Sequence, residues 1–309
     1  MSHLELRLVA AAELGPYIAE LRALEADITY PIADGADQFR IDHGAAYTPF
    51  FTQLGAAYFV LALDRGRTVG AAAGVLRRAS RSGQYVNTVY ICDLKVAPSH
   101  RGRGVARDMF LFALGLLRQP RFRHWRLAYG AAMRGSRGDV MRSARGLHPA
   151  RLGHALARLH IYFQPPARLA TLRPFGSVRP PQLLTAGLDL SPNQAPSQAP
   201  NQAPQDFLTT AGRKDLRLVS TGEAWPLWHL PQSPATASPS WPEYLQRCGA
   251  ALHDRPGQLC FALDDRLVEL THFLAEQGIA PGATCTVYGL GLHPLAWRAP
   301  WVHLSTAEI

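Results

Sequence analysis

The segment that most restricts the fold of this chain spans residues 93–106 and reads DLKVAPSHRGRGVA. Residues 88–96 are rich in β-branched and aromatic side chains, Pro98 follows them, and residues 105–117 carry apolar side chains at helical spacing. This pattern predicts a strand that leads through a glycine-containing turn into a helix. Gly102 and Gly104 would lie at the helix N-terminus, where unpaired backbone N–H groups and the helix dipole favour an anion such as pyrophosphate.

Other phosphate-binding signatures do not fit this segment. The chain contains no Gly-x-x-x-x-Gly-Lys-Ser/Thr, and no Gly-x-Gly-x-x-Gly with an acidic residue after a following strand. The simplest alternative is an ordinary glycine-rich turn with surface arginines. That alternative requires the upstream strand, the two glycines, Arg101 and Arg103 to coincide by accident.

The spacing Arg101-x-x-Gly104-x-Ala106 resembles the pyrophosphate-binding motif of the GNAT superfamily, the acyl-CoA-dependent N-acyltransferases. In that family a strand precedes the motif and ends in an acidic residue, an apolar residue, any residue and valine, and a proline follows. Here those places are occupied by Asp93, Leu94, Lys95, Val96 and Pro98. The resemblance covers about residues 4–165 and is strongest over residues 58–117.

The resemblance implies that acetyl-CoA binds as cosubstrate along this segment. Backbone groups of Leu94 and Val96 would pair with the pantetheine arm, and the N–H of Leu94 would polarise the thioester carbonyl. Asp93 is the candidate base, although pairing with a neighbouring arginine is an equally good role for it. The predicted cofactor-binding residues are Leu94, Lys95, Val96, Arg101, Gly102, Arg103, Gly104, Val105 and Ala106.

The general acid is where the sequence departs from the family. Members commonly have an asparagine followed some seven residues later by a tyrosine, and the matching places here are Ser136 and Ser143. Serine is a poor proton donor to a thiolate, because its pKa lies far from that of a thiol. Tyr129 is the candidate catalytic replacement and Tyr162 the alternative, and each is also an ordinary strand residue.

The predicted fold class is α/β (α+β), a GNAT-like twisted mixed sheet flanked by helices. Its motif strand and the next strand would splay apart to leave a cleft for pantetheine. The expected strands cover residues 4–9, 57–63, 68–76, 88–96, 125–132 and 157–163, and the expected helices cover 11–26, 45–54, 105–117 and 136–145. The polar stretch 33–44 is expected to be a loop beside the substrate.

Residues 191–206 repeat x-Gln-Ala-Pro three times and predict an extended linker. It would separate a GNAT-like domain over 1–190 from a smaller α/β domain over 207–309. That second domain is expected to have strands at 216–220, 258–263, 284–292 and 301–305 and helices at 241–252 and 266–277. It is either a degenerate second GNAT-like copy, a lid, the dimerisation arm of a homodimer or a substrate-selecting lobe.

Composition and charge narrow the choice of partners. No apolar run approaches the roughly 20 residues that span a bilayer, and residues 1–5 lack a signal-peptide pattern, so we expect a cytoplasmic protein without a membrane partner. The four cysteines are scattered without zinc-site spacing, so we expect no metal. Residues 101–179 contain 16 arginines and two acidic residues, which would attract a polyanion such as CoA unless they merely solvate the surface. No helix-turn-helix, RNP or zinc-finger pattern supports nucleic acid as the partner.

These observations favour an N-acetyltransferase that moves an acetyl group from acetyl-CoA to a primary amine of a small molecule or peptide by direct transfer. The alternative is a catalytically weak acyl-CoA-binding or regulatory protein, which Ser136 and Ser143 favour. No motif identifies the acceptor amine.

Overall fold

The structure is a computed structural model and describes residues 4–32, 35–81, 84–125, 127–135, 138–139, 153–173, 184–186, 213–230, 241–291, 302–306 and 309. Among these residues, no helix is both long and apolar enough to cross a membrane. The predicted linker 191–206 lies outside the described residues, and so do Ser136 and Ser143.

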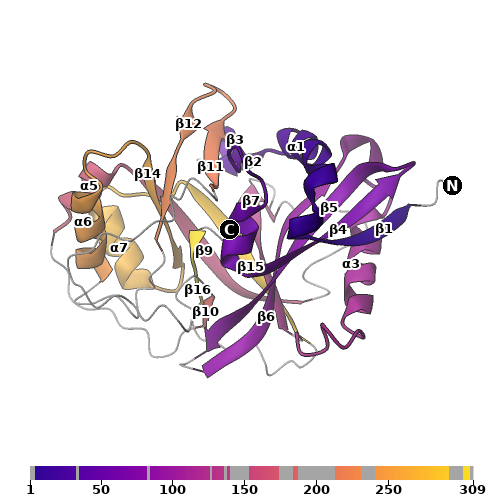
Figure 1. Cartoon of the computed structure of the whole chain (residues 1–309). Helices are drawn as coiled ribbons and strands as arrows, with labels where there is room; N and C mark the ends of the chain where they lie inside the picture. The colour runs from indigo at the N-terminus through magenta and orange to yellow at the C-terminus, as the bar shows by residue number, and fades with distance from the viewer. Residues whose placement is uncertain are drawn as a thin grey trace.

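A large mixed sheet forms the centre of the molecule (Figure 1). Its strands are, in spatial order, β1 (Glu5–Ala10), β4 (Ala56–Asp64), β5 (Arg67–Arg81), β6 (Gln84–Val96), β7 (Leu127–Gly135), β15 (Ala283–Gly291), β9 (His154–Gln164), β14 (Gln258–Asp264) and β13 (Leu227–His229). Attached to this path are β8 (Gly138–Asp139), β10 (Leu184–Ala186) and β16 (Val302–Leu304). A smaller sheet contains, in order, β12 (Ala224–Trp225), β11 (Asp215–Leu218), β3 (Asp37–Asp42) and β2 (Tyr30–Ile32).

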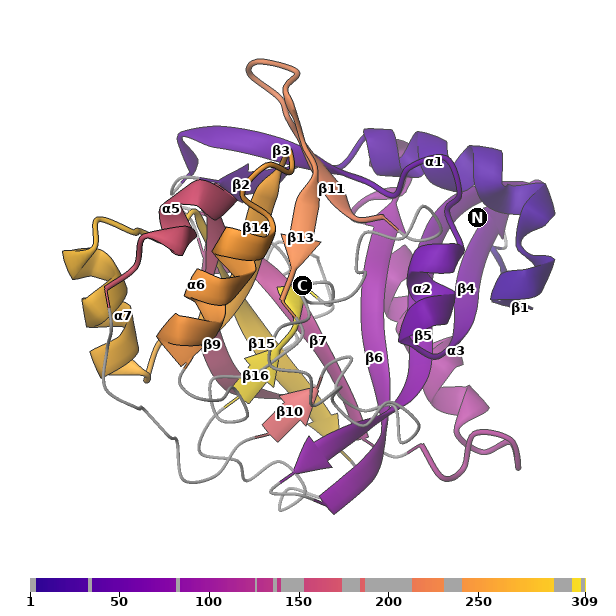
Figure 2. The same ribbon diagram turned by 60° about the vertical axis from the view of Figure 1, so that its left-hand side comes forward.

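Helices cover both faces of the large sheet. Alternation along β4 sends Phe59 and Leu61 into the core that includes residues of α1 (Ile18–Ala26) and α2 (Pro49–Leu54). It sends Val60 and Ala62 into the opposite core, which includes residues of α3 (Val105–Leu116). Figure 2 shows α5 (Pro166–Ala170), α6 (Trp241–Ala251) and α7 (Val268–Glu276) at the other end of the sheet.

The predicted succession of strands and helices is largely confirmed, and two local predictions are wrong. The stretch 33–44 is not a loop, because residues 37–42 form β3, where apolar Phe39 and Ile41 alternate with polar neighbours. The expected helix 136–145 is contradicted at residues 138–139, which pair as β8 with the end of β7. The predicted helix 11–26 is a regular α-helix only from Ile18, after two short 3₁₀ turns.

Strands from the carboxy-terminal part of the chain enter the same sheet as the amino-terminal strands. β15 lies between β7 and β9 and is antiparallel to both. β14 extends the sheet beyond β9. The two parts of the chain therefore share one sheet, and a degenerate second copy of the fold stays a prediction.

Candidate functional site

The site begins where β6 and β7 separate. Their parallel pairing joins Thr88 with Leu127, Val89 with Ala128 and Tyr90 with Tyr129. Gly130 comes next, and a Cβ there would lie 2.8 Å from the carbonyl oxygen of Ile91, so only glycine allows this approach. Among the described residues, no strand pairs with the β7-facing edge of β6 from residue 91 to 96. The predicted splay is therefore present, and it leaves backbone donors and acceptors of β6 available to a ligand.

A β-bulge in β6 lies at this separation. The register with β5 shifts so that Ala71 pairs with Lys95 while Ala73 pairs with Cys92. Asp93 is the extra residue, and its φ of 56° is uncommon for a residue other than glycine. The bulge reverses the alternation of side chains, because Cys92 packs with the α1 and α2 core whereas Leu94 packs with the α3 core.

The predicted anion cradle has the expected geometry. Gly102 has φ of 74°, and Gly104, the residue that caps α3, has φ of 87°. A Cβ at either glycine would meet no other atom within 4 Å, so the loop surface is open. Arg103 is exposed, while Arg101 Nε donates a hydrogen bond to the carbonyl oxygen of Val96 at 3.0 Å, which ties the loop to the end of β6. The arrangement suits a phosphate group at the helix N-terminus.

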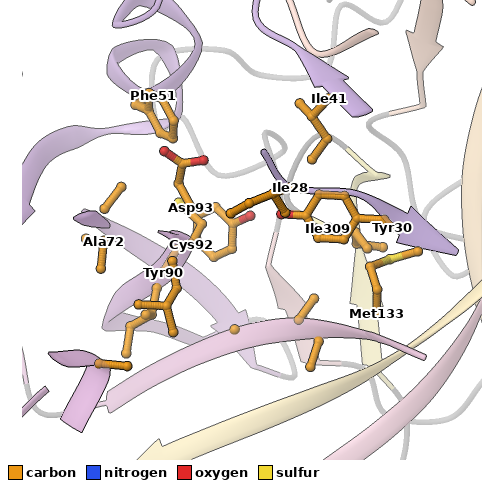
Figure 3. A pocket seen from close by; sticks show the side chains of 18 of the residues that line it. Ile28, Tyr30, Ile41, Phe51, Ala72, Tyr90, Cys92, Asp93, Met133 and Ile309 are labelled. Carbon is orange, nitrogen blue, oxygen red and sulfur yellow. The ribbon is translucent and has the colours of Figure 1, made fainter. Parts of the chain in front are cut away.

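One cavity of about 820 Å³ joins this cradle to the interior. It is lined on one side by Gly102, Gly104 and the edge of β6, and it continues between β6 and β7 to the opposite face of the sheet. There its walls are mainly apolar, as the close view of Asp93 with its neighbours shows (Figure 3). Several lining residues on this second side come from the small sheet and the carboxy-terminal segment: Tyr30, Phe39, Ile41, Lys214, Leu216, His229, Thr306 and Ile309.

Asp93 belongs to a buried polar cluster and pairs with a lysine, not with an arginine. Lys95 Nζ lies 2.5 Å from Asp93 Oδ1, 3.1 Å from Glu25 Oε1 and 2.9 Å from the hydroxyl of Tyr47. The Tyr47 hydroxyl donates to the other oxygen of Asp93, and His43 Nδ1 lies 2.5 Å from Glu25. Burial alone would lower the pKa of Lys95, but Asp93 and Glu25 outweigh it and raise this pKa. Lys95, predicted to bind the cofactor, therefore points its side chain into the cluster.

The same cluster offers three metal-ligating side chains, Glu25, His43 and Asp93, whose ligand atoms lie within 4.8 Å of one another. The ammonium of Lys95 already contacts two of them. A positive side chain thus occupies the place where a metal ion would neutralise the carboxylates, and the cluster is better explained as an internal ion pair.

The predicted tyrosines lie away from the cavity. Tyr129 is buried and stacked on Tyr90 with ring centroids 5.4 Å apart, and burial raises its pKa to about 12. Tyr162 stacks on Phe261 in the core beneath α6 and α7. Tyr30, which the sequence did not single out, lines the cavity instead, and burial followed by the charge of Asp93 raises the pKa of its hydroxyl.

The sequence patterns also did not predict that Lys214 and His229 line the cavity. Both are buried, and both line the cavity from the carboxy-terminal part of the chain. One feature of the sequence sets Lys214 apart: Lys95 and Lys214 are the only lysines among 32 lysines and arginines. His229 Nε2 lies 3.1 Å from the carbonyl oxygen of Lys214, and its Nδ1 lies 2.9 Å from the hydroxyl of Thr306. Burial and the charge of Lys214 lower the pKa of His229 to about 3, so the ring is neutral.

Comparisons with known proteins identify proteins of similar sequence and fold. Residues 20–134 match the model of a family described as the acetyltransferase (GNAT) family. A structure of N-myristoyltransferase from Saccharomyces cerevisiae with bound myristoyl-CoA has 9% identity and a TM-score of 0.52, over 94% of this chain and 79% of that one. This similarity shows a shared fold.

Two further structures resemble the chain less closely in space. A putative acetyltransferase from Pyrococcus horikoshii has 13% identity and a TM-score of 0.47, over 95% of this chain and 91% of that one. Eis1 from Mycobacterium abscessus has 15% identity and a TM-score of 0.33, over 57% of this chain and 37% of that one, so only about a third of Eis1 is matched. A search of curated proteins finds no match.

Proposed function

We propose that the chain, whose residues 20–134 match the model of the acetyltransferase (GNAT) family, moves an acetyl group from acetyl-CoA to a primary amine of a small molecule or peptide. The observation that carries this proposal is the continuous cavity from the cradle at α3, past the separated strands, to Asp93 and the apolar chamber beyond. A cosubstrate and an acceptor can enter such a passage from opposite faces of the sheet and meet at the bulge.

The residues present fit acetyl-CoA. Gly102 and Gly104 leave open space at the N-terminus of α3 for a pyrophosphate. Among the described residues the edge of β6 beyond Tyr90 has no paired strand, so it is available to the amides of pantetheine, which would extend the sheet as an added strand. The N–H of Leu94 is then our candidate for polarising the thioester carbonyl, as the resemblance to the family implies.

In the proposed reaction the unprotonated amine attacks the thioester carbonyl, the C–S bond breaks, and the thiolate leaves. Asp93 takes the proton that the amine loses, directly or through water. Lys95 and Tyr47 contact the two carboxylate oxygens of Asp93, which fixes the position of the base. Tyr30, whose hydroxyl stays protonated at neutral pH, replaces Tyr129 as our candidate proton donor to the thiolate.

Calorimetric titration of acetyl-CoA into the wild type and Gly104→Glu tests the donor site. The glutamate adds bulk and negative charge to the cradle, and we expect affinity to fall by at least 100-fold. Gly66→Glu is the matched control, because Gly66 has φ of 79° and open surroundings like Gly104 but lies in the β4–β5 hairpin. Gly104→Ala separates the strain of a positive φ from the effect of the side chain. No binding to the wild type would refute the proposal.

Thiol release with a panel of amines then separates an enzyme from a catalytically weak acyl-CoA-binding protein. Tight binding of acetyl-CoA without thiol release from any amine would support the second function. Acetyl-CoA and myristoyl-CoA are titrated side by side, because the cavity is larger than an acetyl group requires and the yeast enzyme of the same fold was crystallised with myristoyl-CoA. Tighter binding of myristoyl-CoA would change the proposed acyl group and leave the reaction class unchanged.

A further inference from the structure

The small sheet provides an apolar wall of the chamber beyond the bulge. Side chains alternate along β3, so Phe39 and Ile41 line the cavity while Arg40 between them is exposed. Leu216 of β11 pairs with Ile41 across the strands, and Tyr30 of β2 stacks on Phe39 with ring centroids 5.5 Å apart. Figure 3 shows the side chains of Ile41 and Tyr30 in this wall. A compound that enters the chamber therefore meets aliphatic and aromatic surface.

The polar groups that line the chamber from the carboxy-terminal part of the chain contact one another. Both ring nitrogens of His229 have close partners, which are the carbonyl oxygen of Lys214 and the hydroxyl of Thr306. Thr306 Oγ1 also lies 3.0 Å from the carbonyl oxygen of Cys260. The ammonium of Lys214 donates a hydrogen bond to the main-chain oxygen of Ile309. A ligand rich in hydroxyl groups would have to compete with these contacts after losing its own hydrogen bonds to water.

The charges on the lining residues restrict the acceptor further. Asp27 and Asp93 are the acidic side chains among the described residues that line the cavity. Asp27 is exposed, and the two oxygens of Asp93 already contact Lys95 and Tyr47. Lys214 adds a positive charge to the same chamber. A polyamine or an aminoglycoside carries several ammonium groups, and each needs a carboxylate partner when it leaves water. The side chains described here therefore suit a single amine better than a polycation.

We propose that the acceptor is a primary amine with an apolar body and no second charge. The body lies against Phe39, Ile41 and Leu216, and the nitrogen approaches Asp93. This inference rests on the proposed acetyl transfer, because it names the class of amine that the reaction uses. An apolar chamber also suits the chemistry, because loss of water lowers the pKa of an ammonium group and favours the unprotonated amine that attacks. Acetylation then turns the amine into a neutral amide.

Calorimetry with CoA present compares acetylated products that differ only at the far end of the same alkyl chain. N-hexylacetamide ends in a methyl group, N-acetyl-1,6-diaminohexane in an ammonium group and 6-acetamidohexanoate in a carboxylate. We expect N-hexylacetamide to bind the wild type about tenfold more tightly than either charged compound. Because these compounds are products, the measurement does not depend on turnover.

Two tryptophan variants place the binding site on the inner face of the small sheet. Ile41→Trp fills the chamber from β3, and Arg40→Trp is the matched control, because it adds the same side chain to the exposed face of that strand. Ile41→Trp should weaken N-hexylacetamide by about tenfold or more, whereas Arg40→Trp should leave its Kd within about twofold. Ile41→Ala should weaken it about threefold through lost apolar contact, which provides the test if Ile41→Trp does not fold. Acetyl-CoA is titrated into every sample and should bind all of them equally.

Three results would overturn the inference: N-hexylacetamide does not bind the wild type, a charged compound binds as tightly, or neither Ile41 variant binds it more weakly. Tighter binding of myristoyl-CoA than of acetyl-CoA, lost in Ile41→Trp, would assign the chamber to an acyl chain and would also overturn it. If acetyl-CoA binds and N-hexylacetamide does not, only the acceptor class is wrong. Failure of acetyl-CoA to bind would remove the proposed function itself.

Discussion

Lys214→Met tests how strongly burial of the Lys214 ammonium destabilises the fold. Its pKa falls from an ordinary 10.5 to about 8, chiefly through burial. Each unit corresponds to about 1.4 kcal/mol, so the charged side chain destabilises the native protein by about 3 kcal/mol at pH 7. Methionine is apolar and of similar length, and it removes this cost. We therefore expect the variant to be more stable than the wild type at pH 7.

The pH dependence is the sharper part of the prediction. Below pH 8 the lysine is charged in both the native and the unfolded protein, and the full penalty applies. Between pH 8 and 10.5 the native protein binds fewer protons than the unfolded chain, so wild-type stability rises with pH relative to the variant. The cost of burying the charge should shrink from about 3 kcal/mol at pH 7 to about 1 kcal/mol at pH 10.

Urea unfolding of both proteins at pH 7, 8.5 and 10 measures this difference. The lost hydrogen bond to Ile309 offsets the gain by about 1 kcal/mol at every pH, so it changes the size of the difference but not its slope. The m-values should agree between the two proteins, as required for comparing their free energies of unfolding. A stability difference that stays constant from pH 7 to 10 would refute the reasoning.

Two further substitutions test the polar cluster. Asp93→Asn should lower kcat by about 10²- to 10⁴-fold in steady-state kinetics, because it removes the proposed base. The Kd of acetyl-CoA, measured by calorimetry, should stay within twofold. An unchanged kcat would show that Asp93 is not the base. Lys95→Met should lower the free energy of unfolding by about 3–5 kcal/mol, because it leaves two buried carboxylates without their cation. Urea unfolding measures this loss, and a loss under about 1 kcal/mol would contradict the ion pairing.

The anion cradle at Gly102 and Gly104 could be predicted from the sequence, because local residues alone determine its structure. Strand, turn and helix follow one another within residues 88–117, and two glycines mark the places where the backbone needs positive φ. The β4–β5 turn has the same kind of local cause, because Gly66 has a positive φ there. The splay of β6 and β7 followed from the family resemblance, and the structure adds Gly130 as the residue that allows the last close approach.

The bulge at Asp93 could not be predicted from the pattern of side chains. Regular alternation would place Cys92 and Leu94 on the same face of the sheet, whereas the extra residue puts them on opposite faces. Positive φ at an aspartate leaves no mark in composition or spacing. The pairing of Asp93 with Lys95 and Tyr47 depends on this bulge and on Tyr47, which precedes α2 and lies 46 residues before Asp93 in the chain. Tyr129 does not line the cavity, and periodicity alone does not predict which strand faces do.

The residues that line the cavity beyond Asp93 could not be predicted from local sequence, because they lie on segments that meet only in the shared sheet. β15 is inserted between β7 and β9, and β11 pairs with β3, so segments on either side of the predicted linker build one structure. Lys214 and His229 reach the cavity only through that pairing. A local motif can bind a cosubstrate through backbone groups, whereas the chamber beyond Asp93 exists only when both parts of the chain are assembled. If the proposed function is correct, donor recognition is encoded within a short segment, and acceptor recognition is a property of the whole fold.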